Sequence, residues 1–334
     1  MAYTTIDDPE LYFQTKIWSG NGGTQAITFD GSENMQPDWV WIKRRNDTNG
    51  HTVLDSVRGA TKSLRADATE AEETRASSLT SFDSNGFTLG SDGNVNASGG
   101  TYVAWNWKKV AGVFDIQTYA GNSNGSRTVA HNLGVVPSLI IVKNRTNAAD
   151  WFVGSTTSGV SFNWATDYFR LNEAAAKGTD SGGNLFGAVP TDSVFTPGTN
   201  NDMNGSNNNY VAYLFGNKQG VSKVGSYVGN GNANGTFVYT GFKPAWILRK
   251  NASTGSRSWN IYDVKRGINP NGSPLFADDS AAEPTGDNIV DLLSNGFKQR
   301  ATGGGGNTSG DIYVYMAFAE NPFVTSTGVP ATAR

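Results

Sequence analysis

The sequence predicts an all-β protein made of three tandem antiparallel modules that resemble β-sandwiches or jelly rolls. Glycine accounts for 41 of 334 residues, and Asn-Gly and Gly-Asn pairs divide the chain into short segments typical of strands and hairpins. These segments are rich in apolar and aromatic residues, and one pattern of them occurs three times. Only residues 64–74, with several Ala and Glu, suggest one or two helical turns.

Each copy of the pattern opens with a Gly-Asn pair, a proline and a strand. The pairs begin at Gly20, Gly121 and Gly229. From the proline, each copy reads Pro-x-(Trp/Leu)-(Val/Ile)-(Trp/Ile/Leu)-x-Lys, at residues 37–43, 137–143 and 244–250. A segment that is apolar at nearly every position and bounded by proline and a polar turn is typical of a central strand covered on both faces.

Each copy also closes with a similar strand, at residues 102–107, 210–215 and 313–318. The alternation of Val103, Trp105 and Trp107 indicates a buried face with the period of a strand. We therefore expect one residue of each opening and closing strand to be buried, namely Val40, Val103, Ile140, Val211, Ile247 and Val314.

These patterns divide the chain into an N-terminal arm at 1–15, modules at 16–112, 113–221 and 222–323, and a tail at 324–334. The first and third modules share further motifs, including Asp-x-x-Arg-Gly at 55–59 and 263–267 and Ser-Asn-Gly-Phe at 84–87 and 294–297. The second module lacks both motifs. We interpret it as the divergent copy, changed most in its loops.

The composition excludes several functional classes. The chain has no cysteine, so it has no disulfide, thiol nucleophile or Cys-based zinc site. A net charge of −3 without a basic block gives no footprint for nucleic acid. No apolar run approaches the roughly 20 residues that cross a bilayer, so we expect no membrane insertion. No signal peptide is readable, so we expect the protein to be made in the cytoplasm.

No catalytic, metal or cofactor site is predicted. The two histidines, His51 and His131, have no matched partners in another module and are interpreted as surface or loop residues. No Asp-x-Asp-x-Asp-Gly calcium loop occurs. Four acids repeat between the first and third modules and could suggest a glycosidase pair, although a solvated turn explains them as well: Asp67, Glu72, Asp278 and Glu283.

The Asp-x-x-Arg-Gly motif has two interpretations. Asp55 with Arg58, and Asp263 with Arg266, could recognise a sugar or form structural ion pairs that hold a loop. We favour the structural pairs, because the glycine after each arginine indicates a turn.

Tryptophans are the candidate sugar-stacking residues. Most of them lie in the shared strands, where core packing is expected. Three lie outside those strands and are the candidates for exposure and binding: Trp151, Trp164 and Trp259.

The N-terminal arm carries an apolar set outside the first module, consisting of Tyr3, Ile6, Leu11, Tyr12 and Phe13. Exposed apolar surface favours contact with a neighbour, so we expect the arm to attach the protein to a larger particle. The alternative is that the arm folds back on the first module. We also expect a homo-oligomer, a trimer if the protein is a fibre.

Residues 36–43, 55–59, 84–90 and 313–323 resemble a repeat common in virion and tail-fibre-like proteins of marine tailed bacteriophages. The resemblance covers nearly the whole chain and implies a structural protein of the virion, without established catalytic residues. The resemblance does not place the protein on the particle. Because a cysteine-free, Gly/Asn-rich repeat chain fits a tail fibre, spike or appendage involved in host attachment, we favour that position, with other virion proteins and a host-surface glycan as partners. The alternatives are a capsid decoration protein and a polysaccharide-degrading spike.

Overall fold

The computed structural model describes residues 4, 6–182, 184–267, 273–285 and 289–332. Within these residues the regular structure is almost entirely antiparallel strand, which confirms the all-β prediction. The α-helices are single turns. No helix lies at residues 64–74: these residues hold the end of β5 (Lys62–Arg65), a turn and β6 (Glu73–Thr74), so the helical expectation was wrong. None of the helices in the described part of the chain is long and apolar enough to cross a membrane.

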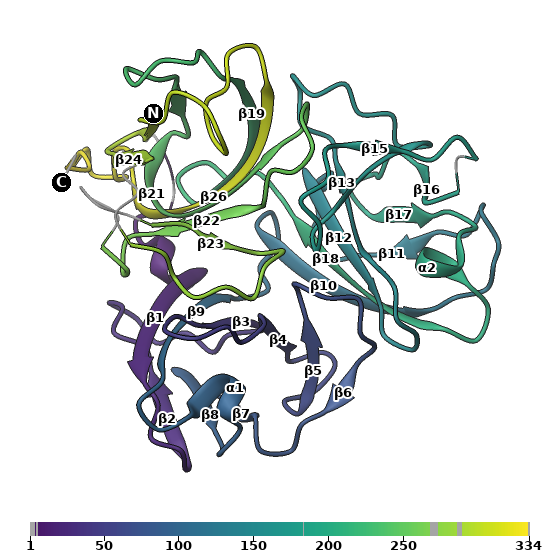
Figure 1. Ribbon diagram of the computed structural model, residues 1–334, viewed down its shortest axis with the longest axis horizontal. Coiled ribbons are helices and arrows are strands. Elements are labelled where there is room, and N and C mark those ends of the chain that lie inside the picture. The colour runs from purple at the N-terminus through teal and green to yellow at the C-terminus, as the bar shows by residue number, and fades with distance from the viewer. Residues whose placement is uncertain (1–3, 5, 183, 268–272, 286–288, 333–334) are drawn as a thin grey trace.

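The elements follow the order of the chain in Figure 1. The first repeat contains η1 (Pro9–Leu11), β1 (Phe13–Ser19), β2 (Gln25–Thr28), β3 (Trp39–Arg44), β4 (Thr52–Asp55), β5 (Lys62–Arg65), β6 (Glu73–Thr74), β7 (Leu79–Asp83), β8 (Gly86–Leu89), α1 (Gly93–Asn96) and β9 (Thr101–Trp107). The second contains β10 (Phe114–Ala120), β11 (Val129–Ala130), β12 (Leu139–Asn144), β13 (Trp151–Ser155), β14 (Asp167–Arg170), β15 (Gly178–Thr179), β16 (Phe186–Ala188), β17 (Val194–Pro197), α2 (Asn201–Asn204) and β18 (Asn209–Phe215). The third contains β19 (Ser222–Val228), β20 (Phe237–Tyr239), β21 (Phe242–Asn251), β22 (Asn260–Asp263), β23 (Leu275–Phe276), β24 (Val290–Leu293), β25 (Gly296–Gln299) and β26 (Ile312–Pro322).

The strand order is the same in each third of the chain, except that the third large sheet has five strands among the described residues where the other two have six. The large sheets run β1-β9-β3-β4-β5-β6, β10-β18-β12-β13-β14-β15 and β19-β26-β21-β22-β23. The small sheets run β2-β8-β7, β11-β17-β16 and β20-β25-β24. The opening and closing strands predicted from the sequence are therefore adjacent in every large sheet. The module boundaries at residues 112 and 221 stay a prediction.

Both faces of each large sheet are buried. In β9, Val103, Trp105 and Trp107 join a central core, whereas Tyr102 and Ala104 pack in an outer core of the first repeat. The strands β12 and β18 divide their residues in the same way, as do β21 and β26. All six residues expected to be buried have an exposed fraction of 1% or less.

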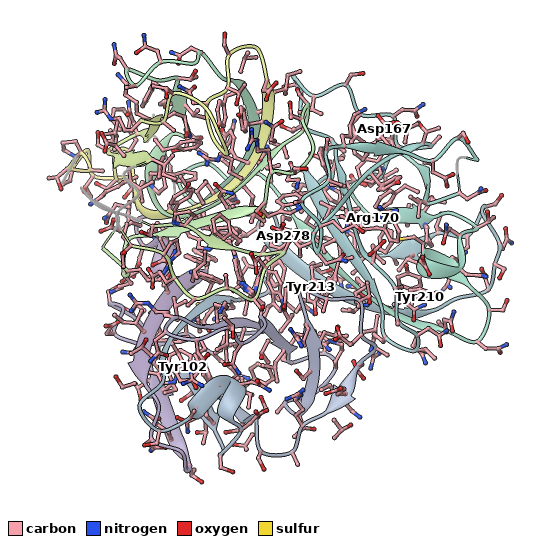
Figure 2. All side chains as sticks on the ribbon, in the orientation of Figure 1. Tyr102, Asp167, Arg170, Tyr210, Tyr213 and Asp278 are labelled. Atoms are coloured by element: carbon pink, nitrogen blue, oxygen red, sulfur yellow. The ribbon has the colours of Figure 1, made fainter. Side chains whose placement is uncertain are left out.

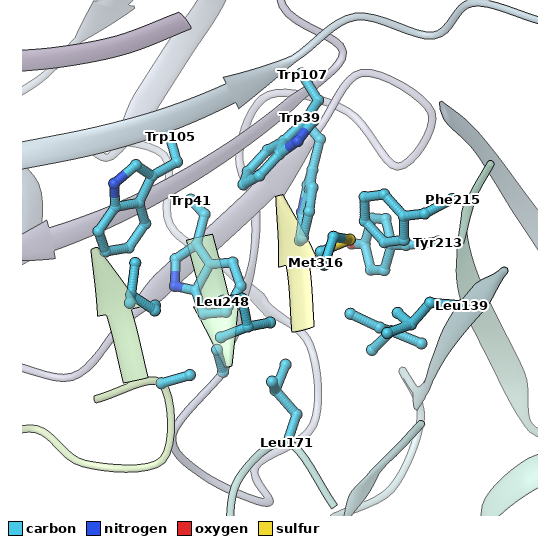
Figure 3. Close-up of a cluster of buried hydrophobic side chains, with 14 of the residues drawn as sticks. Trp39, Trp41, Trp105, Trp107, Leu139, Leu171, Tyr213, Phe215, Leu248 and Met316 are labelled. Atoms are coloured by element: carbon cyan, nitrogen blue, oxygen red, sulfur yellow. The ribbon is translucent and has the colours of Figure 1, made fainter. Parts of the chain in front are cut away.

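The central core brings the three repeats together. Figure 3 shows Trp39 and Trp107 of the first repeat beside Tyr213 and Phe215 of the second, with Met316 of the third close by. The Trp39 ring lies 4.7 Å from the Tyr213 ring, centroid to centroid. One chain thus forms a threefold arrangement of sheets around a shared apolar centre, visible as the lobes of Figure 1.

The Gly-Asn pairs have a specific structural role. A Cβ at the glycine would lie 2.1–2.3 Å from a backbone oxygen of the turn before the closing strand, as for Gly121 and the Gly205 oxygen. The backbone N–H of each asparagine donates to a fully buried asparagine in that turn. In the second repeat this buried residue is Asn204, whose Nδ2 also donates to the carbonyl oxygens of Asn124 and Gly198. The motif therefore ties the start of each repeat to its end.

The N-terminal segment packs on the chain itself. Phe13 lies in β1 and is buried in the central core, where its ring stacks on Phe318 at 5.2 Å. Ile6 and Tyr12 pack against the same core, and Leu11 is half-buried. The expectation that the arm lies apart was wrong for these residues, because the shared core offers a surface that one module alone would not have. Tyr3 lies outside the described residues.

Candidate ligand-binding groove

The lysine that ends the shared Pro-to-Lys motif connects each repeat to another. Lys43 Nζ donates to the Ser280 oxygen at 3.1 Å, Lys143 Nζ to the Thr69 oxygen at 2.8 Å, and Lys250 Nζ to the Glu173 oxygen at 3.0 Å. All three side chains are buried. Burial lowers the pKa of each lysine from 10.5 to about 8, since desolvation disfavours the ammonium form.

The predicted tryptophan platforms are part of the same interfaces. Trp151 Nε1 donates to the Arg65 oxygen at 2.8 Å, and Trp259 Nε1 to the Arg170 oxygen at 2.7 Å. Trp164 is buried in the outer core of the second repeat. The expectation that these three rings are exposed was wrong. A neighbouring repeat covers Trp151 and Trp259, whereas Trp164 packs on residues of its own repeat, including Phe186.

The remaining predicted residues form ion-pair networks at two of the three interfaces. Asp55 and Arg58 have fully buried side chains 2.5 Å apart, and Arg58 also contacts Glu72 at 3.1 Å. Glu72 continues to Arg145 of the second repeat at 2.8 Å, and the Tyr213 hydroxyl donates to Asp55 at 2.7 Å. Glu72, one of the four acids considered as a glycosidase pair, thus links the first repeat to the second.

The interface of the third repeat with the first has the same network. Asp263 pairs with Arg266 at 2.6 Å, Arg266 with Glu283 at 2.9 Å, and Glu283 with Arg45 at 2.5 Å. Trp105 Nε1 donates to Asp263 at 2.9 Å, in the place of the Tyr213 hydroxyl. Asp67 and Asp278 cap the neighbouring strands by accepting the backbone N–H groups of His51 and Trp259.

Among the described residues, the interface of the second repeat with the third does not contain this network. Its turn ends at Gly159, whose φ of +90° matches +104° at Gly59 and +88° at Gly267, so the backbone is retained. Ser155 and Ser158 stand where the motif has Asp and Arg. The Lys177 backbone N–H donates to the Ala252 oxygen, as the Glu72 backbone N–H donates to the Arg145 oxygen. Lys177 therefore occupies the position of Glu72, and Ala252 occupies that of Arg145.

A groove of about 750 Å³ lies at this altered interface. One wall is the loop of Thr156, Thr157 and Ser158 from the second repeat. The other side is formed by β19, β20 and β26 of the third, with these residues among the lining: Lys223, Gly225, Tyr227, Phe237, Tyr239 and Tyr315. The described residues that line it supply hydroxyls, an amide and one cation, but no carboxylate.

The two walls are fixed relative to one another. Ser226 Oγ donates to the Ser158 oxygen at 2.6 Å, and Thr157 Oγ1 lies 3.5 Å from the Val224 oxygen. Asn217 accepts the Val224 N–H at 2.6 Å. Phe237 and Tyr239 point outward on either side of buried Val238, with exposed fractions of 44% and 52%. The groove therefore presents aromatic rings and hydroxyls on a preformed scaffold.

A smaller pocket of about 320 Å³ lies within the second repeat and contains acids. Burial and the nearby Asp150 raise the pKa of Asp202, whereas Asp150 pairs with Arg170 at 2.8 Å. Two carboxyl groups in different environments are what glycoside hydrolysis needs. This pocket is the place where a hydrolytic activity would be sought.

The side chains labelled in Figure 2 show how the interfaces lie around the centre. Tyr213 and Asp278 are near the middle of the view, whereas Tyr102 and Tyr210 lie in the outer parts of their repeats. His51, fully buried, accepts from Trp41 Nε1 at 2.8 Å, and burial lowers its pKa to about 3. The described residues contain no group of three or more His, Asp and Glu side chains that could hold a metal ion.

Comparison with known proteins identifies the family. The family described as "Domain of unknown function (DUF7483)" matches residues 8–322, so the chain belongs to it. The match spans all three repeats as a single unit, as does the central core. The comparison with curated proteins gave no match.

Proposed function

We propose that this member of the DUF7483 family is a structural protein of a bacteriophage virion, in a tail fibre, spike or appendage, and that it binds a host-surface glycan without cleaving it. The resemblance of the repeat to tail-fibre-like proteins supports the virion assignment. The observation that carries the binding role is the groove between the second and third repeats, where exposed aromatic rings and hydroxyls stand on fixed walls.

The chemistry of the groove favours binding over cleavage. Glycosidases use a pair of carboxyl groups across the scissile bond, and the residues lining this groove in the described chain include none. The hydroxyls of Thr156, Thr157 and Ser158 can exchange hydrogen bonds with a sugar, while the apolar faces of Phe237 and Tyr239 can cover its ring. Such a surface recognises a ligand and leaves its bonds intact.

Gold labelling of an epitope-tagged copy in intact virions tests the location. We expect label at the tail, together with binding of purified protein to host cells. Label at the capsid faces would instead support a decoration protein, and no label on purified virions would overturn the virion assignment. The central core is formed by the three repeats of one chain, so it does not itself require a second copy. The homo-oligomer therefore stays a prediction, which analytical ultracentrifugation can test.

The acidic pocket provides the test of the enzymatic alternative. Purified protein incubated with host polysaccharide should release no soluble oligosaccharide, and Asp202→Asn should change nothing. Release that disappears in Asp202→Asn would replace binding by hydrolysis as the function, with Asp202 as the general acid.

A further inference from the structure

We propose that the groove between the second and third repeats takes a carboxylate-bearing sugar, with its ring on Phe237 and Tyr239 and its carboxylate at Lys223. This inference rests on the glycan-binding part of the proposed function and names the class of glycan. It is carried by a comparison of equivalent positions inside the chain, because the three repeats share one strand order and so provide two internal references.

The aromatic pair occurs in the third repeat alone. Val238 is paired with Phe297, Ile27 with Phe87, and Val129 with Phe195, so these three residues occupy one position of the small sheet. Phe237 and Tyr239 flank that position in the third repeat. The flanking residues in the other repeats are Ala26 and Thr28, and Thr128 and Ala130.

Outward rings are therefore not required by the fold, since small residues serve at the same positions. Exposed apolar rings cost solubility without stabilising a core. Phe237 and Tyr239 are also the aromatic members of the set of exposed large apolar residues in the described chain, and both line the groove.

A second difference between the repeats concerns the pair of residues on the edge strand and its neighbour beneath these rings. Lys16 is paired with Ala104 in the first repeat, and Gln117 with Ala212 in the second. In the third, Gly225 is paired with Tyr315, and a Cβ on Gly225 would lie 2.6 Å from the Tyr315 hydroxyl oxygen. The large residue has moved from the edge strand to its neighbour, so that a glycine borders the groove and a tyrosine ring lines it.

Lys223 supplies the charge. It is half-buried in β19 and has no ion-pair partner among the described residues. Its counterparts by strand register are Gln14 and Asp115, so a cation here is specific to the third repeat. Because the lining contains this cation and no carboxylate, a ligand with a carboxylate gains a charge-assisted hydrogen bond that a neutral sugar lacks.

The test uses surface polysaccharide of the host, before and after chemical reduction of its carboxyl groups to alcohols. Two variants transfer residues of the first repeat to the groove: Lys223→Gln, and the double variant Phe237→Ala with Tyr239→Thr. Lys62→Gln, in β5 of the first repeat, is the matched control. The replacement residues in the groove already occur at the equivalent positions of the first repeat, and Lys62 is half-buried like Lys223, so we expect wild-type melting curves.

Wild-type protein and Lys62→Gln should bind the native polysaccharide at least tenfold more tightly than the reduced one in a calorimetric or biosensor assay. Lys223→Gln should bind both forms equally, at the level of wild type with the reduced form. The aromatic double variant should lose binding to both forms.

Equal binding of native and reduced polysaccharide by wild type, or an unchanged preference in Lys223→Gln, would overturn the assignment, as would no binding at all. These results are independent of the virion labelling. Tail label with equal binding of native and reduced polysaccharide would refute this inference alone. No binding of either form would also refute the glycan-binding part of the proposed function, and sugar binding by a protein absent from virions would refute the proposed location.

Discussion

Replacing Asp55 by alanine isolates the energetic role of the network between the first and second repeats. The substitution leaves Arg58, whose side chain is fully buried, with Glu72 as its remaining carboxylate, and it removes the acceptor of the Tyr213 hydroxyl. Breaking a buried ion pair from one side costs about 3–5 kcal/mol, and an unsatisfied hydroxyl adds about 1 kcal/mol or more. We expect Asp55→Ala to lower the free energy of unfolding by ~4 kcal/mol.

Two controls make this prediction specific. Asp47→Ala removes an acid that pairs with Arg44 at the surface and should cost about 0–1 kcal/mol. The double variant Asp55→Ser with Arg58→Ser installs the residues that the second repeat carries at Ser155 and Ser158. Because it removes both charges, it should cost less than Asp55→Ala alone.

The free energies come from urea denaturation followed by circular dichroism, with equal slopes required among the variants compared. A loss for Asp55→Ala that matches Asp47→Ala would show that the pair contributes nothing. A double variant less stable than the single one would show that the arginine, and not charge balance, holds the turn.

Three further predictions concern the interfaces and the arm. Burial lowers the pKa of Lys143 from 10.5 to about 8, so between these pH values the unfolded chain binds more protons than the folded chain. The unfolding free energy of wild type relative to Lys143→Met should therefore rise by ~3 kcal/mol from pH 8 to 10.5. A difference that stays constant over this range would contradict the lowered pKa. Asn204→Ala should lower the unfolding free energy by about 3 kcal/mol, since it leaves buried backbone groups unpaired; a loss below ~1 kcal/mol in urea denaturation would refute that role. Deleting residues 1–14 removes Phe13 from the central core and should lower the melting temperature; an unchanged melting curve would restore the idea of a separate arm.

The sequence was sufficient for the strands because their signals are local. The Pro-to-Lys pattern at residues 37–43 and the closing strand at 102–107 each showed strand periodicity and turn residues, and β3 and β9 lie there as neighbours. The Asp-x-x-Arg motif indicated a pair three residues apart on one turn, which is also a local relation. Residues 64–74 misled because their composition favours a helix, whereas sheet pairing with β4 determines the structure of Lys62–Arg65.

The central core could not be predicted, since it depends on how the repeats meet. Trp151 and Trp259 appeared peripheral when each module was considered alone, yet neighbouring repeats bury both. Phe13 appeared to lie outside a module for the same reason. The groove had a signal that was present but not used: aligning the three repeats by Phe87, Phe195 and Phe297 would have shown rings at 237 and 239 where the other copies have small residues.

The last prediction concerns the altered interface, where an ion-pair network is absent from the described residues and a ligand groove is present. Four positions differ together there, and Met316, which cannot donate a hydrogen bond, stands where the other interfaces have the Tyr213 hydroxyl and the Trp105 indole. Changes at all members of one network are expected if a structural interface was given up for a ligand site.

Restoring the ion pairs should then abolish binding of the polysaccharide. The variant Ser155→Asp, Ser158→Arg, Lys177→Glu and Ala252→Arg rebuilds the ion pairs of the other two interfaces and replaces one hydroxyl of the groove wall by a long side chain. Because Lys177→Glu also removes the ion pair of Lys177 with Asp167, we expect an unfolding free energy within ~2 kcal/mol of wild type by urea denaturation, together with at least a tenfold loss of polysaccharide binding. The variant Ser155→Asp with Lys177→Glu, which leaves the groove wall unchanged, is the control and should retain binding if it folds. A quadruple variant that still binds as wild type would mean that the interface diverged for a reason other than the groove.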